Sequence, residues 1–277
     1  MEGGHLTPLP LSKEVIIRIF FTSLCLILLF LCTVANAKIV FSFKDTDNLS
    51  GIYVMDDDGS NTTLLTDTLS PRSPRWAPDG KQIVFERRVK LNDSQKVHLF
   101  IMNADGTNIR ELTEPIQPDG RDLHASFSPD GKYIVFRRYE RIDNDNKKHS
   151  ICVMDIESGK VKKISDLGVN TPAWSPDGKQ IVFTTIPVAG MSGGNVWIMG
   201  DNGRNARDLL PPPPEDGLII SRWNPRWSPD GKQILYTEDR DKLDLIDGVL
   251  HYIPQGYYYF IYDLRSKQSK RLTSQTI

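Results

Sequence analysis

Cysteine and histidine are scarce in this chain. The 277 residues include 3 cysteines and 5 histidines. Cys25 and Cys32 both precede residue 37, so Cys152 is alone in the remainder and cannot form a disulfide there. Its apolar flanks, Ile151 and Val153, predict a buried strand residue without reactivity. No two histidines have the spacing of metal ligands, so we expect neither a metal nor another cofactor.

The sequence also lacks an excess of charge of one sign. It has 34 basic and 35 acidic residues, which gives a net charge of -1, and no window concentrates either sign. A nucleic-acid-binding surface is therefore not expected. Beyond residue 37 there is no amphipathic helical pattern of useful length, so strands must build the fold.

The first 37 residues differ from the rest. Lys13 and Arg18 precede an apolar run over residues 19–35, and the segment ends in Ala35-Asn36-Ala37. Small residues at 35 and 37 are typical of an export cleavage site, so we expect residues 1–37 to be a signal peptide. The alternative is an uncleaved N-terminal anchor, because a run of about 17 residues is at the lower limit of a membrane span. Either reading predicts export to the periplasm or secretion.

One short motif occurs four times. Each copy is an aromatic residue, one further residue and Pro-Asp-Gly, followed by an apolar strand. The four copies are Trp76-Ala-Pro-Asp-Gly80, Phe127-Ser-Pro-Asp-Gly131, Trp174-Ser-Pro-Asp-Gly178 and Trp227-Ser-Pro-Asp-Gly231. The prolines fall at 78, 129, 176 and 229, and this spacing is in the range of propeller blades.

Each repeat reads as a meander of four antiparallel strands. In the third copy, residues 172–174 form a short strand and Ser175-Pro-Asp-Gly178 has the composition of a type I turn. Apolar strands over 181–183 and 196–199 follow, and a turn at 201–203 leads to a fourth strand at 206–210.

The middle strands are continuously apolar. Ile83-Val-Phe85, Ile134-Val-Phe136 and Ile181-Val-Phe183 show no alternation, so both faces of each sheet must be covered. Since no helix is available, the cover must be the neighbouring sheet, which predicts radial stacking around an axis. We therefore predict an all-β propeller of four-stranded antiparallel blades.

The Trp-Ser-Pro-Asp-Gly-Lys turn, the Ile-Val-Phe strand and the following Ile-Tyr-Val-Met-Asp hairpin together resemble the TolB-type propeller repeat of exported bacterial proteins. The resemblance covers residues 38–277, which we expect to form one propeller domain. It implies the fold rather than an activity, because such repeats occur in binding scaffolds, peptidase-associated propellers and some carbohydrate-active enzymes.

Two departures from that family are expected. The small α/β domain in front of the TolB propeller has no counterpart here, since repeats begin at Ile39-Val-Phe41. About five units can be counted, of which the first lacks its inner strand and turn. We expect an open or imperfectly closed ring of five blades with an incomplete first blade. A naturally shortened chain is the alternative.

Two patterns that suggest chemistry are explained by their context. Gly190-Met-Ser192-Gly-Gly194 matches the Gly-x-Ser-x-Gly nucleophile pattern, but a strand follows it where the nucleophile elbow requires a helix. Acidic clusters at 45–48, 143–146 and 239–241 lack the glycine and distal glutamate of a helical calcium loop. We interpret them as solvated loops.

The candidate site is the mouth of the central channel and the loops beside it. His124 immediately precedes the first strand of its unit, and Arg75, Thr171 and Asn224 are expected at equivalent positions in other units. Arginine and tryptophan are common anchors of protein interfaces. The predicted partner-binding residues are Arg75, Glu86, Arg87, His124, Arg137, Arg138, Arg222, Trp223, Asn224 and Glu238.

The sequence therefore favours an exported, non-catalytic propeller scaffold, expected to be a monomer, that binds an envelope or extracellular protein. The absence of a visible nucleophile–base or metal pattern beside these loops motivates this hypothesis. The alternative is a carbohydrate-active enzyme or sugar binder at the channel mouth, with a role for His124. Contact with a membrane is expected only through an uncleaved N-terminal segment.

Overall fold

A computed structural model describes residues 37–44, 50–91, 94–114, 119–143, 146–167, 169–185, 194–211, 218–246 and 249–273. Three features named above lie wholly or mainly outside these ranges: the predicted leader, the Ser192 motif and the acidic cluster at 45–48. The described residues form nineteen β-strands. No described helix has the length and apolar character needed to cross a membrane.

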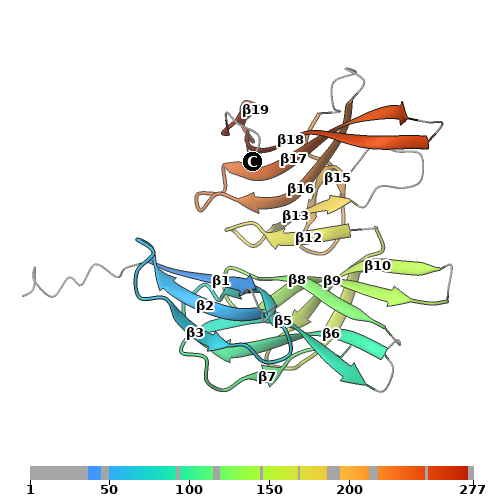
Figure 1. The fold of residues 1–277 in the computed structure, drawn as a ribbon. Coiled ribbons are helices and arrows are strands. Elements are labelled where there is room, and N and C mark those ends of the chain that lie inside the picture. The colour runs from blue at the N-terminus through green and yellow to red at the C-terminus, as the bar shows by residue number, and fades with distance from the viewer. Residues whose placement is uncertain are drawn as a thin grey trace, which may run out of the picture.

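The strands form successive antiparallel meanders in chain order (Figure 1). The first sheet contains β1 (Lys38–Lys44), β2 (Ser50–Asp56) and β3 (Thr63–Thr66). An eight-stranded sheet follows, made of two meanders that meet at a single parallel bridge between Val97 and Arg121. Its strands are β4 (Arg72–Trp76), β5 (Gln82–Leu91), β6 (Ser94–Asn103), β7 (Arg110–Glu111), β8 (Arg121–Phe127), β9 (Tyr133–Arg141), β10 (Lys147–Asp155) and β11 (Val161–Ser165).

Two four-stranded sheets complete the described chain. They contain β12 (Val169–Trp174), β13 (Gln180–Thr185), β14 (Val196–Gly200) and β15 (Arg207–Asp208), then β16 (Leu218–Trp227), β17 (Gln233–Ile246), β18 (Val249–Asp263) and β19 (Gln268–Arg271). The predicted all-β fold of four-stranded antiparallel units is therefore confirmed, and the first unit has three described strands.

The Pro-Asp-Gly turns join the first and second strands of their units, as the sequence predicts. In the second copy, Gly131 N donates to Ser128 O at 2.9 Å, and Ser128 Oγ donates to Asp130 Oδ1 at 2.6 Å. Gly131 has φ of +71°, a region that glycine enters without a steric penalty. A Cβ on Gly178 would lie 3.7 Å from Pro129 Cδ, so successive turns rest against each other.

The core consists of layers between neighbouring sheets. In β9, Ile134 and Phe136 pack in one cluster with Val84 of β5, whereas Val135 packs in another with Phe183 of β13. All five side chains are at most 1% exposed. Alternate residues of one strand thus bury against two different sheets, which explains why the strand is continuously apolar.

The first and last units each present an uncovered face. Leu235 of β17 is 37% exposed, although its counterparts Val84, Val135 and Val182 are fully buried. At the other end, Phe43 of β1 is 56% exposed. Among the described residues, β1–β3 make no contact with β16–β19. The described sheets therefore form an open series.

We expect Phe183→Ala to lower the free energy of unfolding by about 3–5 kcal/mol, because the ring fills the layer between two sheets. Leu235→Ala is the matched control, since it removes an apolar side chain from the uncovered face of the last sheet, and its loss should be much smaller. Urea denaturation of both variants measures the difference. Equal losses would contradict the layered core.

Candidate functional site

The innermost strand of four units carries the same irregularity. A register shift interrupts the pairing of β4, β8, β12 and β16 with the next strand. At each shift one non-glycine residue adopts a left-handed conformation, and these residues are Ser73 (φ 52°), His124 (φ 56°), Thr171 (φ 46°) and Asn224 (φ 53°). Such a residue costs on the order of 1–3 kcal/mol, so the surrounding fold must hold it.

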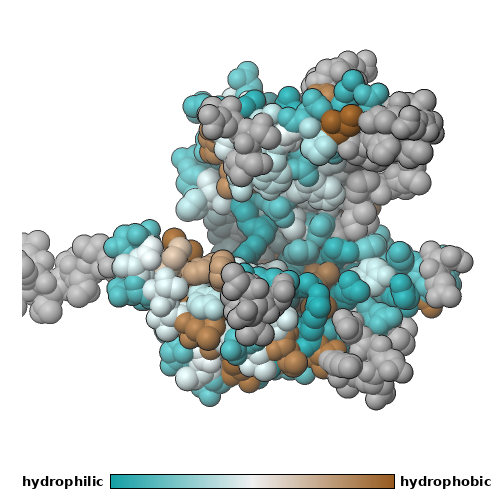
Figure 2. Space-filling model, viewed as in Figure 1, coloured by the Kyte–Doolittle hydropathy of each residue, from teal (hydrophilic) through white to brown (hydrophobic). Residues whose placement is uncertain are grey.

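These four bulges direct polar side chains into one cavity. The cavity has a volume of about 390 Å³ and is lined by Ser73, Arg75, His124, Thr171, Asn224, Arg226, Leu235, Thr237, Tyr257 and Tyr259. A bulge re-aims side chains, and bulges often occur next to functional sites. The surface is hollowed between the sheets of β1–β11 and those of β12–β19, and hydrophilic residues gather there (Figure 2).

Glu86 supports the bulge of the neighbouring unit. Its carboxylate is 1% exposed. It accepts hydrogen bonds from the His124 backbone N at 2.8 Å and from Arg72 Nε at 2.8 Å. The His124 Nδ1 lies 3.8 Å from Glu86 Oε1. A buried carboxylate with these partners is satisfied, so Glu86 fixes the left-handed backbone of His124 at the cavity wall.

His124 is neutral at pH 7. Its pKa is lowered to about 4, chiefly by burial; Glu86 opposes this shift, and the positive charges of Arg137, Arg226 and Arg75 add to it. The cavity therefore has a positive electrostatic character that disfavours one more cation.

Arg137 joins three strands beside the cavity. Its Nη2 and Nε lie 2.9 and 3.2 Å from Nδ1 of His149 in β10, and its Nη1 donates to Asn170 Oδ1 in β12 at 3.2 Å. Burial first, and then the charges of Arg137 and Lys147, lower the pKa of His149 to about 4. A neutral His149 can therefore accept a hydrogen bond from Arg137.

Two buried ion pairs occupy the same register position with opposite polarity. In the third unit, Asp122 of β8 accepts two 2.8 Å hydrogen bonds from Arg138 of β9. In the fifth, Arg222 of β16 donates to Glu238 of β17 at 3.1 Å. Asp122 is paired with Arg138, and Arg222 with Glu238, at corresponding points of the two ladders. These residues connect the first two strands of their units.

The structure brings some of the predicted site residues together and separates others. Arg75, His124 and Asn224 line the cavity, and Glu86 and Arg137 adjoin His124. Arg138, Arg222 and Glu238 form the buried pairs just described, with Arg222 only 6% exposed. The partner-binding role of all these residues stays a prediction.

Arg87 and Trp223 contact other parts of the sheets. The Arg87 guanidinium lies 5.2 Å from the Phe100 ring centroid. A Cβ on Gly194 would lie 3.0 Å from Cζ3 of Trp223, so the indole covers the preceding unit. Packing of the indole against the neighbouring sheet is sufficient to explain the presence of a tryptophan at position 223.

One expected equivalence is wrong. Arg75 is not the counterpart of His124, because the bulge places Ser73 at that position. Arg75 corresponds instead to Arg226, as each directly precedes the motif tryptophan of its unit. Counting back from Trp76 and Trp227 would have revealed Arg226, which the sequence-based site omits.

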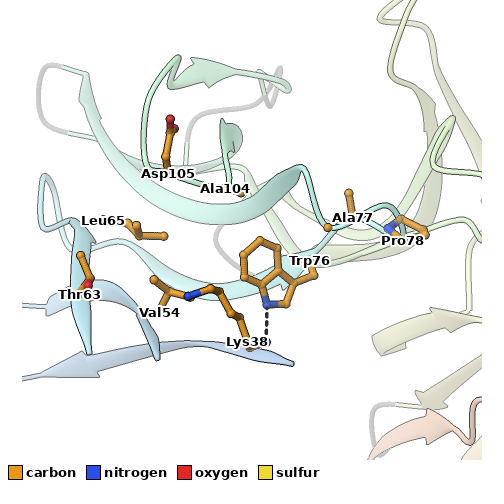
Figure 3. Close-up of a pocket in the computed structure, with 10 residues that line it drawn as sticks. Lys38, Val54, Thr63, Leu65, Trp76, Ala77, Pro78, Ala104 and Asp105 are labelled. Carbon is orange, nitrogen blue, oxygen red and sulfur yellow. Dashed lines mark hydrogen bonds between the residues drawn. The ribbon is translucent and has the colours of Figure 1, made fainter. Parts of the chain in front are cut away.

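A second cavity, of about 840 Å³, lies between β1–β3 and the second unit (Figure 3). Trp76 Nε1 donates to Lys38 O at 3.1 Å there. Val54, Leu65 and Ala77 contribute to its lining, and Lys38 and Asp105 are its only charged lining residues among those described. It lacks the convergent polar side chains of the smaller cavity.

Cys152 is a core residue, as predicted. It is 2% exposed and packs between sheets with Phe136. Burial raises the pKa of its thiol to about 11, so the reactive thiolate is scarce at neutral pH.

Comparisons with known proteins agree on the fold. The family model described as TolB beta propeller domain matches residues 89–244. The crystal structure of TolB from Acinetobacter baumannii is similar with a TM-score of 0.63 and 20% identity, over 87% of this chain and 53% of that chain. At this identity the likeness shows the fold alone.

Curated relatives match over parts of the chain. Dipeptidyl-peptidase 5 of Porphyromonas gingivalis is 30% identical over 115 residues, which are 39% of this chain and 16% of that protein. An uncharacterized protein of Agrobacterium fabrum is 27% identical over 146 residues, covering 50% of this chain and 47% of the relative. The chain thus spans less than half the length of these curated relatives.

We predict that His124 and His149 make the protein less stable in mild acid. Because their pKa values are about 4 in the folded state and near 6.5 when unfolded, the unfolded state binds protons first as the pH falls. Stability should decrease from about pH 6.5 to 4. The double variant His124→Asn/His149→Gln should show a shallower decrease in urea-unfolding free energy over this window. An unchanged slope would refute the assignment.

We also predict that Asp122→Asn lowers the free energy of unfolding by about 3–5 kcal/mol, because it leaves the Arg138 guanidinium buried without its carboxylate. The reversed double variant Asp122→Arg/Arg138→Glu should recover part of that loss, since the fifth unit already holds this polarity. Asp201→Asn, at an exposed turn, is the control. Urea denaturation gives the comparison, and a loss no larger than that of the control would contradict the prediction.

Proposed function

Because the chain belongs to the TolB β-propeller family, we propose that it is an exported, non-catalytic scaffold. It binds a segment of an envelope or extracellular protein in the cavity between its innermost strands. That family includes TolB itself and propeller-bearing peptidases, so membership alone leaves the activity open.

The convergence of the four bulges carries this proposal. Ser73, His124, Thr171 and Asn224 come from four separate units, and each has a left-handed backbone at the cavity. Strained residues persist only where the fold holds them, and they are frequent at binding sites. Polar side chains that converge on a concave surface are the usual features of a ligand site.

The proposed architecture is a ring of five blades, the first incomplete, that stays open between β1–β3 and β16–β19. Support comes from the exposed faces of Phe43 and Leu235 and from the chain-order packing of the sheets. The open side would let a partner segment reach the cavity. The proposal includes a cleaved leader at 1–37, a propeller domain at 38–277, a monomeric state and a periplasmic or secreted location.

The function predicts a partner that contacts the cavity. A photoreactive p-benzoylphenylalanine in place of Asn224 should give a discrete cross-linked product with one envelope or extracellular protein in producing cells, detected by mass spectrometry. The same group in place of Asn202, in an exposed turn, is the matched control. No product at position 224, or the same products at both positions, would reject this binding site.

A sugar-directed activity is the second candidate, and the contact between His124 and Glu86 favours it. The imidazole is unprotonated at pH 7 and lies 3.8 Å from the buried carboxylate of Glu86, so it can accept a proton, although a pKa of about 4 makes it a weak base. A polysaccharide panel with the wild-type protein and His124→Asn tests it. Turnover lost in the variant would support it, and no turnover by the wild-type protein would dismiss it.

A further inference from the structure

Building on the proposed function, we propose that Arg75 and Arg226 together bind a carboxylate of an acidic peptide segment in the cavity. Both side chains line the same cavity although they come from β4 and β16, in the second and fifth units. The inference assigns a chemical class to the ligand and two residues that recognise it.

The two arginines are held in the same way. Arg75 Nη1 donates to Pro74 O at 2.8 Å, and Arg226 Nη1 donates to Pro225 O at 2.8 Å. In each case the carbonyl belongs to the preceding proline, so the repeated backbone orients both guanidinium groups. One donor is used by each contact, which leaves other N–H groups of each fork for a ligand.

Neither guanidinium has a carboxylate partner in the described part of the chain. Two other arginines of the inner strands do have one: the buried Arg222 pairs with Glu238, and the partly exposed Arg72 pairs with Glu86. The charge of Glu86 acts on Arg75, but the Glu86 oxygens already accept hydrogen bonds from Arg72 and the His124 backbone. The cavity therefore contains more positive than negative charge.

This excess is unfavourable without an anion. Burial first, and then the charge of Arg75, lower the pKa of Arg226 to about 10. Burial also lowers the pKa of Arg75. Two buried like charges that repel each other are stabilised by a shared counter-charge, and guanidinium groups bind carboxylates through paired hydrogen bonds.

The rest of the lining favours a peptide over a sugar. Beside the arginines lie Leu235, Tyr257 and Tyr259, an apolar and aromatic wall from the uncovered face of the last sheet. The described lining contains no aspartate or glutamate to accept from sugar hydroxyls. A volume of about 390 Å³ is near the lower end of ligand sites, so only a short segment enters.

Calorimetric titration of the full chain with acetyl-triglutamate amide tests the inference. We expect saturable binding that is at least about tenfold weaker for the triglutamine analogue, which differs only in charge, because a bidentate charged contact is lost. Arg75→Gln and Arg226→Gln should each weaken binding of the triglutamate by a similar factor. Arg204→Gln removes an exposed turn arginine and should leave it unchanged.

Thermal unfolding without peptide checks that the variants fold. Arg75→Gln and Arg226→Gln should not lower Tm, because each removes a buried charge that has no carboxylate partner. In the wild-type protein, triglutamate should raise Tm, and Arg75→Gln/Arg226→Gln should abolish this rise. Binding that survives the double substitution, or that Arg204→Gln weakens equally, would overturn the proposal.

Two further outcomes distinguish a failure of this inference from a failure of the proposed scaffold function. If triglutamate does not bind but the Asn224 cross-link still forms, the carboxylate inference fails and the scaffold function stands. If trigalacturonate binds in an arginine-dependent manner and triglutamate does not, the acidic peptide is replaced by an acidic sugar, which overturns the peptide assignment.

Discussion

The structure depends on the burial of the middle strands of the inner units between two neighbouring sheets. In β9, Ile134 faces one neighbour and Val135 the other, and both are fully buried. Such a sheet has no solvent face, so each unit depends on the units beside it. The first and last described sheets lack a neighbour on one side, and Phe43 and Leu235 are exposed there. The same packing holds the innermost strands close enough to share a cavity.

That packing also explains how four strained residues persist. A left-handed Thr171 is costly because a β-branched side chain disfavours positive φ. Glu86 in one unit accepts from the His124 backbone in the next, so contact between units fixes the bulge there. The free-energy cost of the left-handed bulge residues is thereby offset by the apolar packing between the sheets. The polar side chains of the cavity are therefore oriented before any ligand binds.

Sequence patterns predict the repeated elements well because their causes are local. The Ser128–Gly131 turn is determined by four adjacent residues, and the buried strands by their continuous apolar runs. The bulges could not be predicted, since Ser73 and His124 adopt positive φ without the glycine that usually indicates it. Which arginines are paired also depends on register: Arg222 meets Glu238 across a ladder, whereas Arg226, four residues later, faces the cavity.

The central claim is that the bulges of separate units converge on one cavity, and paramagnetic broadening tests it most directly. A nitroxide is attached at Asn224→Cys in a chain with Cys25 and Cys32 changed to serine. The account predicts that it broadens the backbone amide signals of Ser73, His124 and Thr171 together, while Gly131, in a Pro-Asp-Gly turn, is affected least. Broadening confined to the neighbouring unit, with Ser73 unaffected, would contradict it.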